Sequence, residues 1–342
     1  MKKKEKVLSN LRCFCLSFFS VFMFMFFSSC SIKKMAFNAV ANGMAPSYKQ
    51  KVNERERVKK LKEKGIEVPN PMLAFLGEDD VELVGKVFPF IIKMYEMMML
   101  QEKNHEGLAL MTGEFYVMYA NAFVESPAVF LPDVEYDKKH EQFGRARKLY
   151  LRGYNLVLNA LNILIPGFKD VMLGTDEGAI DEVLKKCGKE HVEHLYWAGV
   201  AALAAFAIEP MNTETSYLVY AGRSMLEKAS EIEPFFNNGA LWEALTKFYA
   251  ASPESLGGGE EKAMIAYQKA FEASNGENPS IYVTYASSFC IPKQDEKGFD
   301  DALNKALAID AKANKENVLM FTISQNYAKW LKAHKRDFIL GN

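Results

Sequence analysis

Cysteine is scarce in this sequence of 342 residues, which contains five. Cys13, Cys15 and Cys30 all lie close to the N-terminus, so only Cys187 and Cys290 remain in the body of the chain. Two cysteines cannot provide a disulfide framework, and the sequence leaves open whether these two pair. The fold must therefore be held by a hydrophobic core, for which 49% apolar residues are ample.

The sequence also lacks an excess of basic residues. Lys and Arg number 42 and Asp and Glu number 43, for a formal charge of −1. Five of the basic residues and one of the acidic residues fall within residues 1–29, so the remainder of the chain has a charge of −5. Phosphate backbones are bound by clustered positive charge, so we expect no nucleic-acid partner.

Short catalytic and cofactor motifs are missing as well: the sequence contains no GxSxG, no HExxH and no dinucleotide fingerprint. The glycine-rich segment 256–259 lacks the Lys-Ser/Thr of a phosphate loop and predicts a turn. Cys187, His191 and His194 would share one helix face and could hold zinc, but Gly188 interrupts the helix and no fourth ligand is evident. We expect no metal, no cofactor and no enzyme.

Residues 1–29 have the three parts of an export signal. Basic residues come first, and an apolar run follows over residues 14–27. That run is shorter than the roughly 20 residues of a membrane-spanning helix. Ser28 and Ser29 then precede Cys30, which resembles the cleavage site of a bacterial lipoprotein although Phe27 replaces the usual Leu. We predict cleavage and lipidation at Cys30; an uncleaved anchor and cleavage without lipid are the alternatives.

Residues 30–71 are predicted to form a lipid tether and a charged lead-in. Ser31 is not the Asp that retains many lipoproteins at the inner membrane, which favours the outer membrane, facing the periplasm, over the inner membrane. Residues 49–64 are dominated by charge and predict a solvated helix.

Residues 72–338 are predicted to be one all-α domain, because apolar residues recur at steps of three and four. This periodicity is clear over residues 81–101 and 145–164. Residues 115–124 predict a helix that stops before Pro127. Residues 194–208 are apolar all round and predict a buried helix.

The C-terminal half contains a degenerate repeat. A Lys-Ala pair recurs at residues 228, 269 and 305, spacings of 41 and 36, each late in an amphipathic segment. Helix pairs at this period are typical of tetratricopeptide-like arrays, in which stacked hairpins share a core and form a concave surface. Residues 317–334 would close the array, with Tyr327, Trp330 and Leu331 facing inward.

Aromatic side chains gather on these predicted helices. Most should pack in the core, while some should line a groove or pore, because Tyr and Trp suit surfaces with one wet edge. The candidates for a ligand or partner surface are Tyr150, Tyr154, Tyr196, Trp197, Trp242, Tyr249 and Tyr285.

The order and spacing of several segments resemble the T-component (TatT) lipoproteins associated with TRAP transporters. The resemblance covers residues 72–338, with Trp242 at a position where a His is expected. Its segments are DDVELV at 79–84, YANAFVE at 119–125, RARKLYLRGYNLVLNAL at 145–161, LYWAGVAALAAF at 195–206, GALWEAL at 239–245, SPESLGGGEEKA at 252–263 and YVTYASSF at 282–289.

The resemblance implies a lipoprotein that forms a homotrimer with a pore through each protomer. It also implies a periplasmic solute-binding protein (the P-component) as partner, and a small organic or hydrophobic ligand. Our leading hypothesis is a non-enzymatic, lipid-anchored accessory in TRAP-type solute uptake. The alternative is a tetratricopeptide-like scaffold that organises envelope proteins without transferring a ligand.

Lipidation at Cys30 is directly testable. Cys30→Ala should abolish incorporation of a fatty-acid analogue in cells, because the thioether that carries the diacylglycerol needs this sulfur. Labelling of the variant at the wild-type level would contradict lipidation.

Overall fold

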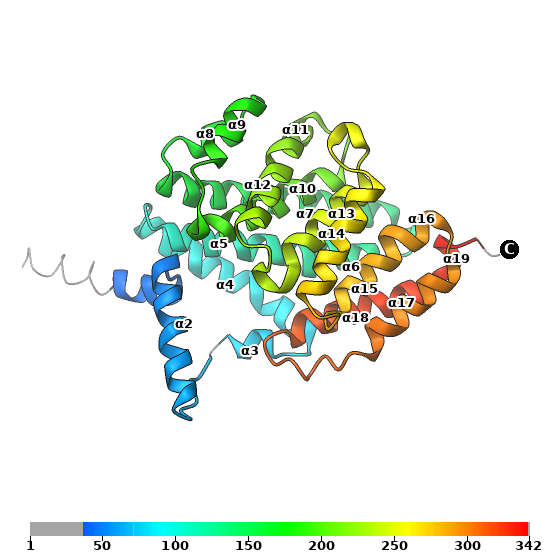
Figure 1. Ribbon diagram of the computed structural model, residues 1–342, viewed down its shortest axis with the longest axis horizontal. Coiled ribbons are helices and arrows are strands. Elements are labelled where there is room, and N and C mark those ends of the chain that lie inside the picture. The colour runs from blue at the N-terminus through cyan, green and yellow to red at the C-terminus, as the bar shows by residue number, and fades with distance from the viewer. Residues whose placement is uncertain (1–36, 71, 341–342) are drawn as a thin grey trace, which may run out of the picture. The chain divides into compact units, whose positions relative to one another are not determined.

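The computed structural model describes residues 37–70 and 72–340, and every regular element in these ranges is a helix (Figure 1). The expected all-α class is thereby confirmed. The predicted signal peptide (residues 1–29) and Cys30 lie outside the described residues. The chain divides into an N-terminal unit that ends at Lys51 and a body that begins at Val52.

The charged lead-in forms helix α2 (Tyr48–Glu63), which buries no residue. This agrees with the solvated helix that the high charge of residues 49–64 predicts. Side chains such as Glu54 and Arg57 pair along the helix at 2.6 Å instead of facing a core.

The first half of the body is organised around long helices α4, α5 and α7. It contains α3 (Leu73–Leu76), α4 (Val81–Gln101), α5 (Glu106–Ala120), the π-helical turn η1 (Asn121–Glu125), α6 (Ser126–Val129), η2 (Asp133–Glu135), α7 (Tyr136–Leu164), α8 (Phe168–Met172) and α9 (Glu177–Leu184).

The second half continues with shorter helices. It contains η3 (Lys189–His191), α10 (Val192–Ile208), α11 (Thr213–Ser216), α12 (Leu218–Ile232), η4 (Phe236–Gly239), α13 (Ala240–Ala251), η5 (Glu254–Leu256), α14 (Glu260–Ala273), α15 (Pro279–Tyr285), the π-helical turn η6 (Ala286–Cys290), α16 (Ile291–Lys293), α17 (Glu296–Ala308), α18 (Val318–Ala333) and α19 (Lys335–Phe338).

Most predicted helices are found where the periodicity places them, but the one predicted over residues 115–124 was wrong at both ends. Helix α5 begins at Glu106, and the helical path runs through η1 into α6, past Pro127. A proline clashes with the carbonyl four residues earlier in an α-helix, and the wider π-helical turn immediately before α6 changes that register. The same arrangement recurs where η6 precedes Pro292 in α16.

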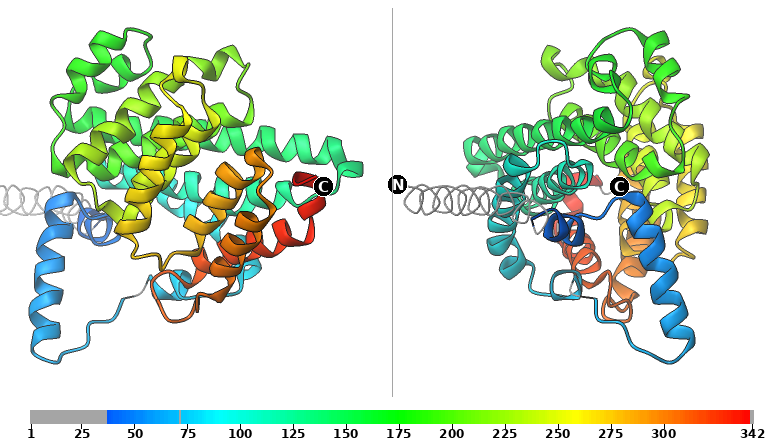
Figure 2. Two further views of the ribbon diagram at one scale, coloured as in Figure 1. Left: turned by 45° about the vertical axis from the view of Figure 1, so that its right-hand side comes forward. Right: turned by 90° about the vertical axis from the view of Figure 1, so that its left-hand side faces the viewer.

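Helices that are neighbours in sequence pack side by side, and the last long helix returns to the first ones (Figure 2). Helix α18 contacts both α3 and α4, and Lys312 forms an ion pair with Asp79 at 2.5 Å. On the inner side of α18, Leu331 is 1% exposed, and Trp330 lies 5.4 Å from the ring of Phe130. The helices of the body therefore form a closed array.

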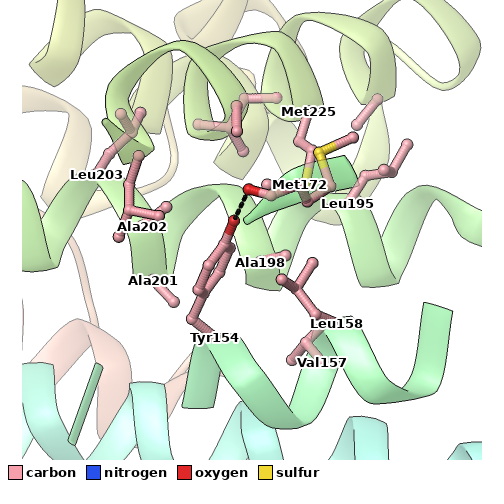
Figure 3. Close-up of a cluster of buried hydrophobic side chains, with 14 of the residues drawn as sticks. Tyr154, Val157, Leu158, Met172, Leu195, Ala198, Ala201, Ala202, Leu203 and Met225 are labelled. Atoms are coloured by element: carbon pink, nitrogen blue, oxygen red, sulfur yellow. Dashed lines mark hydrogen bonds between the residues drawn. The ribbon is translucent and has the colours of Figure 1, made fainter. Parts of the chain in front are cut away.

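The main core lies between α7, α10 and α12 (Figure 3). Tyr154 is fully buried there, and its hydroxyl donates a hydrogen bond to the carbonyl of Met172 at 3.2 Å. The stretch Lys189–Ile208 is long and apolar enough to cross a membrane, but 56% of its most apolar window is buried in the protein. Its composition is that of a core helix, as predicted for residues 194–208.

Helices α5 and α7 approach closely at two glycines. A methyl group at Gly153 would lie 2.8 Å from Cγ2 of Val117 and 2.9 Å from the carbonyl oxygen of Gly113. Both distances are too short for carbon, so the absence of a side chain fixes the separation of these helices.

This contact predicts opposite effects for two substitutions in one helix. Gly153→Ala should destabilise the protein by roughly 1–3 kcal/mol, because the added methyl forces α5 and α7 apart. Gly144→Ala, where a methyl meets nothing within 4 Å, should stabilise it by about 0.5–1 kcal/mol through helix propensity. Urea unfolding of the two variants measures both changes in stability. Equal changes would contradict the close approach of α5 and α7.

Candidate functional site

Polar side chains from separate helices meet on the inner side of the closed array. We call the following residues the inner polar cluster: Asn121 and Glu125 of η1, Tyr150 of α7, Glu243 and Lys247 of α13, and Ser280 and Thr284 of α15. Its members range from position 121 to position 284 of the sequence. The fold brings these distant positions together, and the cluster is therefore a product of the tertiary structure.

Helix α13 contributes an ion pair one turn apart. The Lys247 ammonium lies 2.7 Å from Oε1 of Glu243. The same carboxylate accepts hydrogen bonds from the hydroxyls of Ser280 at 2.5 Å and Thr284 at 3.2 Å. Glu243 thus ties α13 to α15 and leaves none of its charge uncompensated.

The π-helical turn η1 contributes the second carboxylate. Glu125 accepts a hydrogen bond from the hydroxyl of Tyr150, and the side chain of Asn121 also bonds to it. A π-helical turn widens the helix and often marks a functional site. Here it places both Asn121 and Glu125 at the cluster.

The side chain of Lys247 is reached by solvent: 58% of it is accessible, compared with 13% for Glu243. Its charge also influences Glu125 of η1 and Tyr327 of α18. Solvent therefore reaches part of the inner polar cluster.

Three further residues lie within electrostatic reach of the cluster. The hydroxyl of Tyr327 on α18 is influenced by both Lys247 and Glu125. The hydroxyl of Tyr196 on α10 is influenced by Glu243 and by Glu114 of α5. The charged groups of the cluster therefore also act on side chains of α10 and α18.

The two carboxylates of the cluster have opposite pKa shifts. Burial raises the pKa of Glu125, and the hydrogen bonds from Tyr150 and Asn121 only partly oppose this effect. Burial acts on Glu243 in the same way, but Lys247, Ser280 and Thr284 outweigh it and lower the pKa. Burial and the nearby Glu125 raise the pKa of Tyr150 well above its ordinary value, so its hydroxyl stays a donor.

Two of the seven predicted aromatic residues reach the inner polar cluster, Tyr150 directly and Tyr196 through its hydroxyl. Trp197 packs edge-on against Tyr196 with ring centroids 5.0 Å apart. Tyr154 is fully buried in the core. The remaining three make other contacts: Trp242 donates to the carbonyl of Pro234, Tyr249 donates to Glu227, and Tyr285 packs against Tyr267.

Sequence reasoning missed Glu125, Glu243 and Lys247. The pair in α13 has the i, i+4 spacing of ordinary ion pairs on exposed helix faces, so its sequence signal is the same as that of a surface pair. Glu125 stands in the segment YANAFVE, where nothing marks it as buried. Only the closure of the array distinguishes Glu125 and Glu243 from the other acidic residues, and Lys247 from the other lysines.

The residues weighed as zinc ligands are held in other interactions. Gly188 does interrupt the helix, and its N–H donates to Nδ1 of His191 at 3.0 Å. Nε2 of His194 lies 2.6 Å from Glu106. Cys187 and Cys290 are both free and buried. Within residues 37–70 and 72–340, no group of three or more His, Cys, Asp or Glu is placed to hold a metal ion.

The glycine-rich segment forms the turn between α13 and α14, as predicted. Gly257 and Gly259 have positive φ values of 83° and 116°, a conformation that glycine adopts without strain. Arg223 donates to the carbonyl of Leu256 at 3.0 Å and fixes this turn to α12.

The fold defines an all-α protein whose helices close into one array, with a polar cluster between them that solvent reaches at Lys247. A model of the family described as TRAP transporter T-component matches residues 77–339, and the chain belongs to this family. An uncharacterized protein of Treponema pallidum (strain Nichols) is 40% identical over 313 residues, which cover 92% of this chain and 94% of the relative. Family membership confirms the resemblance and ties the chain to a TRAP transport system.

The raised pKa of Glu125 predicts a pH dependence of stability. The folded protein holds this proton more tightly than the unfolded chain does. The contribution of Glu125 to stability therefore falls as pH rises from the ordinary carboxyl range through the folded pKa, and is constant above it.

Glu125→Gln should remove this dependence. The variant should gain stability relative to the wild type at neutral pH, and the gain should shrink as pH falls toward 4.5, the ordinary pKa. Urea unfolding across this range measures it, with Glu182→Gln on the exposed face of α9 as the control. A gain that grows on acidification would contradict the raised pKa.

Proposed function

We propose that this protein is a lipid-anchored periplasmic component of a TRAP-type solute uptake system. It docks a solute-binding protein and conducts a small organic ligand through the inside of its closed array. Family membership supports the link to TRAP transport. The anchor at Cys30 and attachment to the outer membrane rest on the sequence pattern of residues 1–31.

The observation that carries this proposal is the inner polar cluster, in which 58% of the Lys247 side chain is accessible to solvent. Burying charged groups is costly, and a chain that needed only a rigid scaffold would gain stability from an apolar interior. This chain instead brings carboxylates, an ammonium and hydroxyls together on the inner side of the array, where solvent reaches Lys247. Such groups give a polar ligand the contacts that it loses on leaving water.

The proposal involves no chemical reaction. Glu243 is neutralised by Lys247, and Glu125 accepts from Tyr150, so both carboxylates are positioned by structural partners. The family is a transporter component, which agrees with a role in transfer and not in catalysis.

Self-association into a trimer has a candidate surface on α4. Its inner face carries the buried Val84, Phe88 and Tyr95. A second apolar stripe runs along the helix at steps of four, three and seven and is exposed: Leu83 (51%), Val87 (38%), Phe90 (65%) and Met97 (57%). Exposed apolar stripes of this kind favour contact with another protein surface.

The tetratricopeptide-like scaffold remains the competing function, and the α4 stripe is the observation that favours it. A scaffold needs outer surfaces for partners, and it makes no use of polar side chains on the inner side of the array.

Co-expression with the solute-binding protein of the adjacent gene separates the two functions. The mature, full-length protein in detergent should form a trimer that retains the solute-binding protein, as measured by light scattering after size exclusion. A trimer that never retains this partner would favour the scaffold. Phe90→Asp should reduce the mass of the assembly, whereas Tyr136→Asp, also 65% exposed, should leave it unchanged.

A further inference from the structure

We infer that helix α2 lies on the surface of the membrane that holds the lipid anchor, with one basic face against anionic phospholipid headgroups. This inference goes beyond the proposed function. It takes from that proposal only the anchor at Cys30, and its test uses protein that lacks the anchor. Helix α2 lies outside residues 77–339, the part of the chain that matches the family.

The charge of α2 is opposite in sign to that of the chain that follows it. Residues 48–64 contain eight Lys or Arg and three Glu, for a charge of +5. Residues 65–342 contain 27 Lys or Arg and 39 Asp or Glu, for a charge of −12. An anionic membrane surface attracts basic segments and repels acidic ones. Electrostatics therefore favours contact through α2 over contact through the rest of the body.

The basic residues of α2 include a stripe along one face of the helix. Its four members recur at steps of four, four and three, so their side chains lie one above another. We call these residues the basic stripe: Lys51, Arg55, Lys59 and Lys62. At about 100° per residue, Glu56 and Glu63 lie together on a different face, and Glu54 is paired with Arg57 at 2.6 Å. No carboxylate interrupts the stripe itself.

The basic stripe is available to a partner outside the protein. Helix α2 buries no residue, and Arg55, Lys59 and Lys62 are exposed. Within residues 37–70 and 72–340, these three side chains make no hydrogen bond and no ion pair. Their charge is therefore not neutralised by the acidic body, and it can act on a neighbouring surface.

The anchor predicted at Cys30 would keep the basic stripe close to a membrane. Residues 31–50 separate Cys30 from Lys51, and a segment of this length spans at most about 70 Å even when fully extended. Tethering over such distances gives effective concentrations of the order of millimolar. Each Lys or Arg near an anionic surface strengthens binding about fivefold. A contact that is weak by itself is therefore well populated when the chain is tethered.

The contact should be electrostatic and should remain among the headgroups. The aliphatic residues of α2 are Val52, Val58 and Leu61, and they do not align along one face. A helix that inserts into the acyl boundary needs a broad apolar face, which α2 does not have. Binding should accordingly weaken as salt is added, because the Debye length falls from about 8 Å at physiological ionic strength to about 3 Å at 1 M.

Sedimentation with vesicles tests the inference on residues 31–342, which include every described element and carry no lipid. One set of vesicles contains equal parts of phosphatidylcholine and phosphatidylglycerol, and the other contains phosphatidylcholine alone. In a buffer of low ionic strength the protein should sediment with the anionic vesicles only, and NaCl at about 0.5 M should release it.

Absence of binding to the anionic vesicles, or equal binding to both sets, would overturn the inference. Neither result bears on the proposed function, because fatty-acid labelling at Cys30 and retention of the solute-binding protein are measured in separate experiments.

Two triple variants with the same net charge test which face of α2 makes the contact. The first removes three charges of the basic stripe: Arg55→Gln, Lys59→Gln and Lys62→Gln. The second removes three exposed charges from another face of the same segment: Lys49→Gln, Lys60→Gln and Lys64→Gln.

The first variant should lower the partition coefficient for anionic vesicles at least tenfold, because its three charges face the headgroups. The second should lower it by no more than about threefold, because its three charges lie farther from the surface. Losses of equal size, or a larger loss in the second variant, would overturn the assignment of the basic stripe as the membrane-facing surface.

Discussion

Contact between α18 and the helices α3 and α4 is the constraint on which the rest of the body depends. An open array of helix pairs would leave its inner face to bulk water, and polar side chains there would need no partners. Closure encloses that face instead. The polar side chains on it must then satisfy one another, and those of the inner polar cluster do so.

Much of the fold could be predicted from the sequence, because apolar periodicity is a local signal. The helix expected over residues 81–101 coincides with α4, and the buried helix expected over residues 194–208 is α10. The site could not be predicted in this way. Glu125 and Glu243 lie in different halves of the body, and only the tertiary fold brings both of them close to Lys247. Aromatic residues gave a partial signal, since Tyr150 and Tyr196 reach the cluster whereas Tyr154 serves the core.

The error at Pro127 links local backbone geometry to the site. Proline usually ends a helix, and a stop before Pro127 was the simplest expectation. The π-helical turn η1 lets the helical path continue, and the same turn carries Asn121 and Glu125. The tolerance for proline and the position of the second carboxylate therefore have one structural cause.

The extra residue that makes η1 a π-helical turn also sets the angular phase of everything that follows it in this helical segment. One residue corresponds to about 100° of rotation around a helix axis. Deleting a single position within Asn121–Glu125 would restore α-helical winding. It would rotate Glu125 by about 100° around the helix axis, away from Tyr150. The length of this turn is therefore more tightly constrained than the identity of its side chains. An insertion or deletion here would displace the residues of the inner polar cluster more than those of the core.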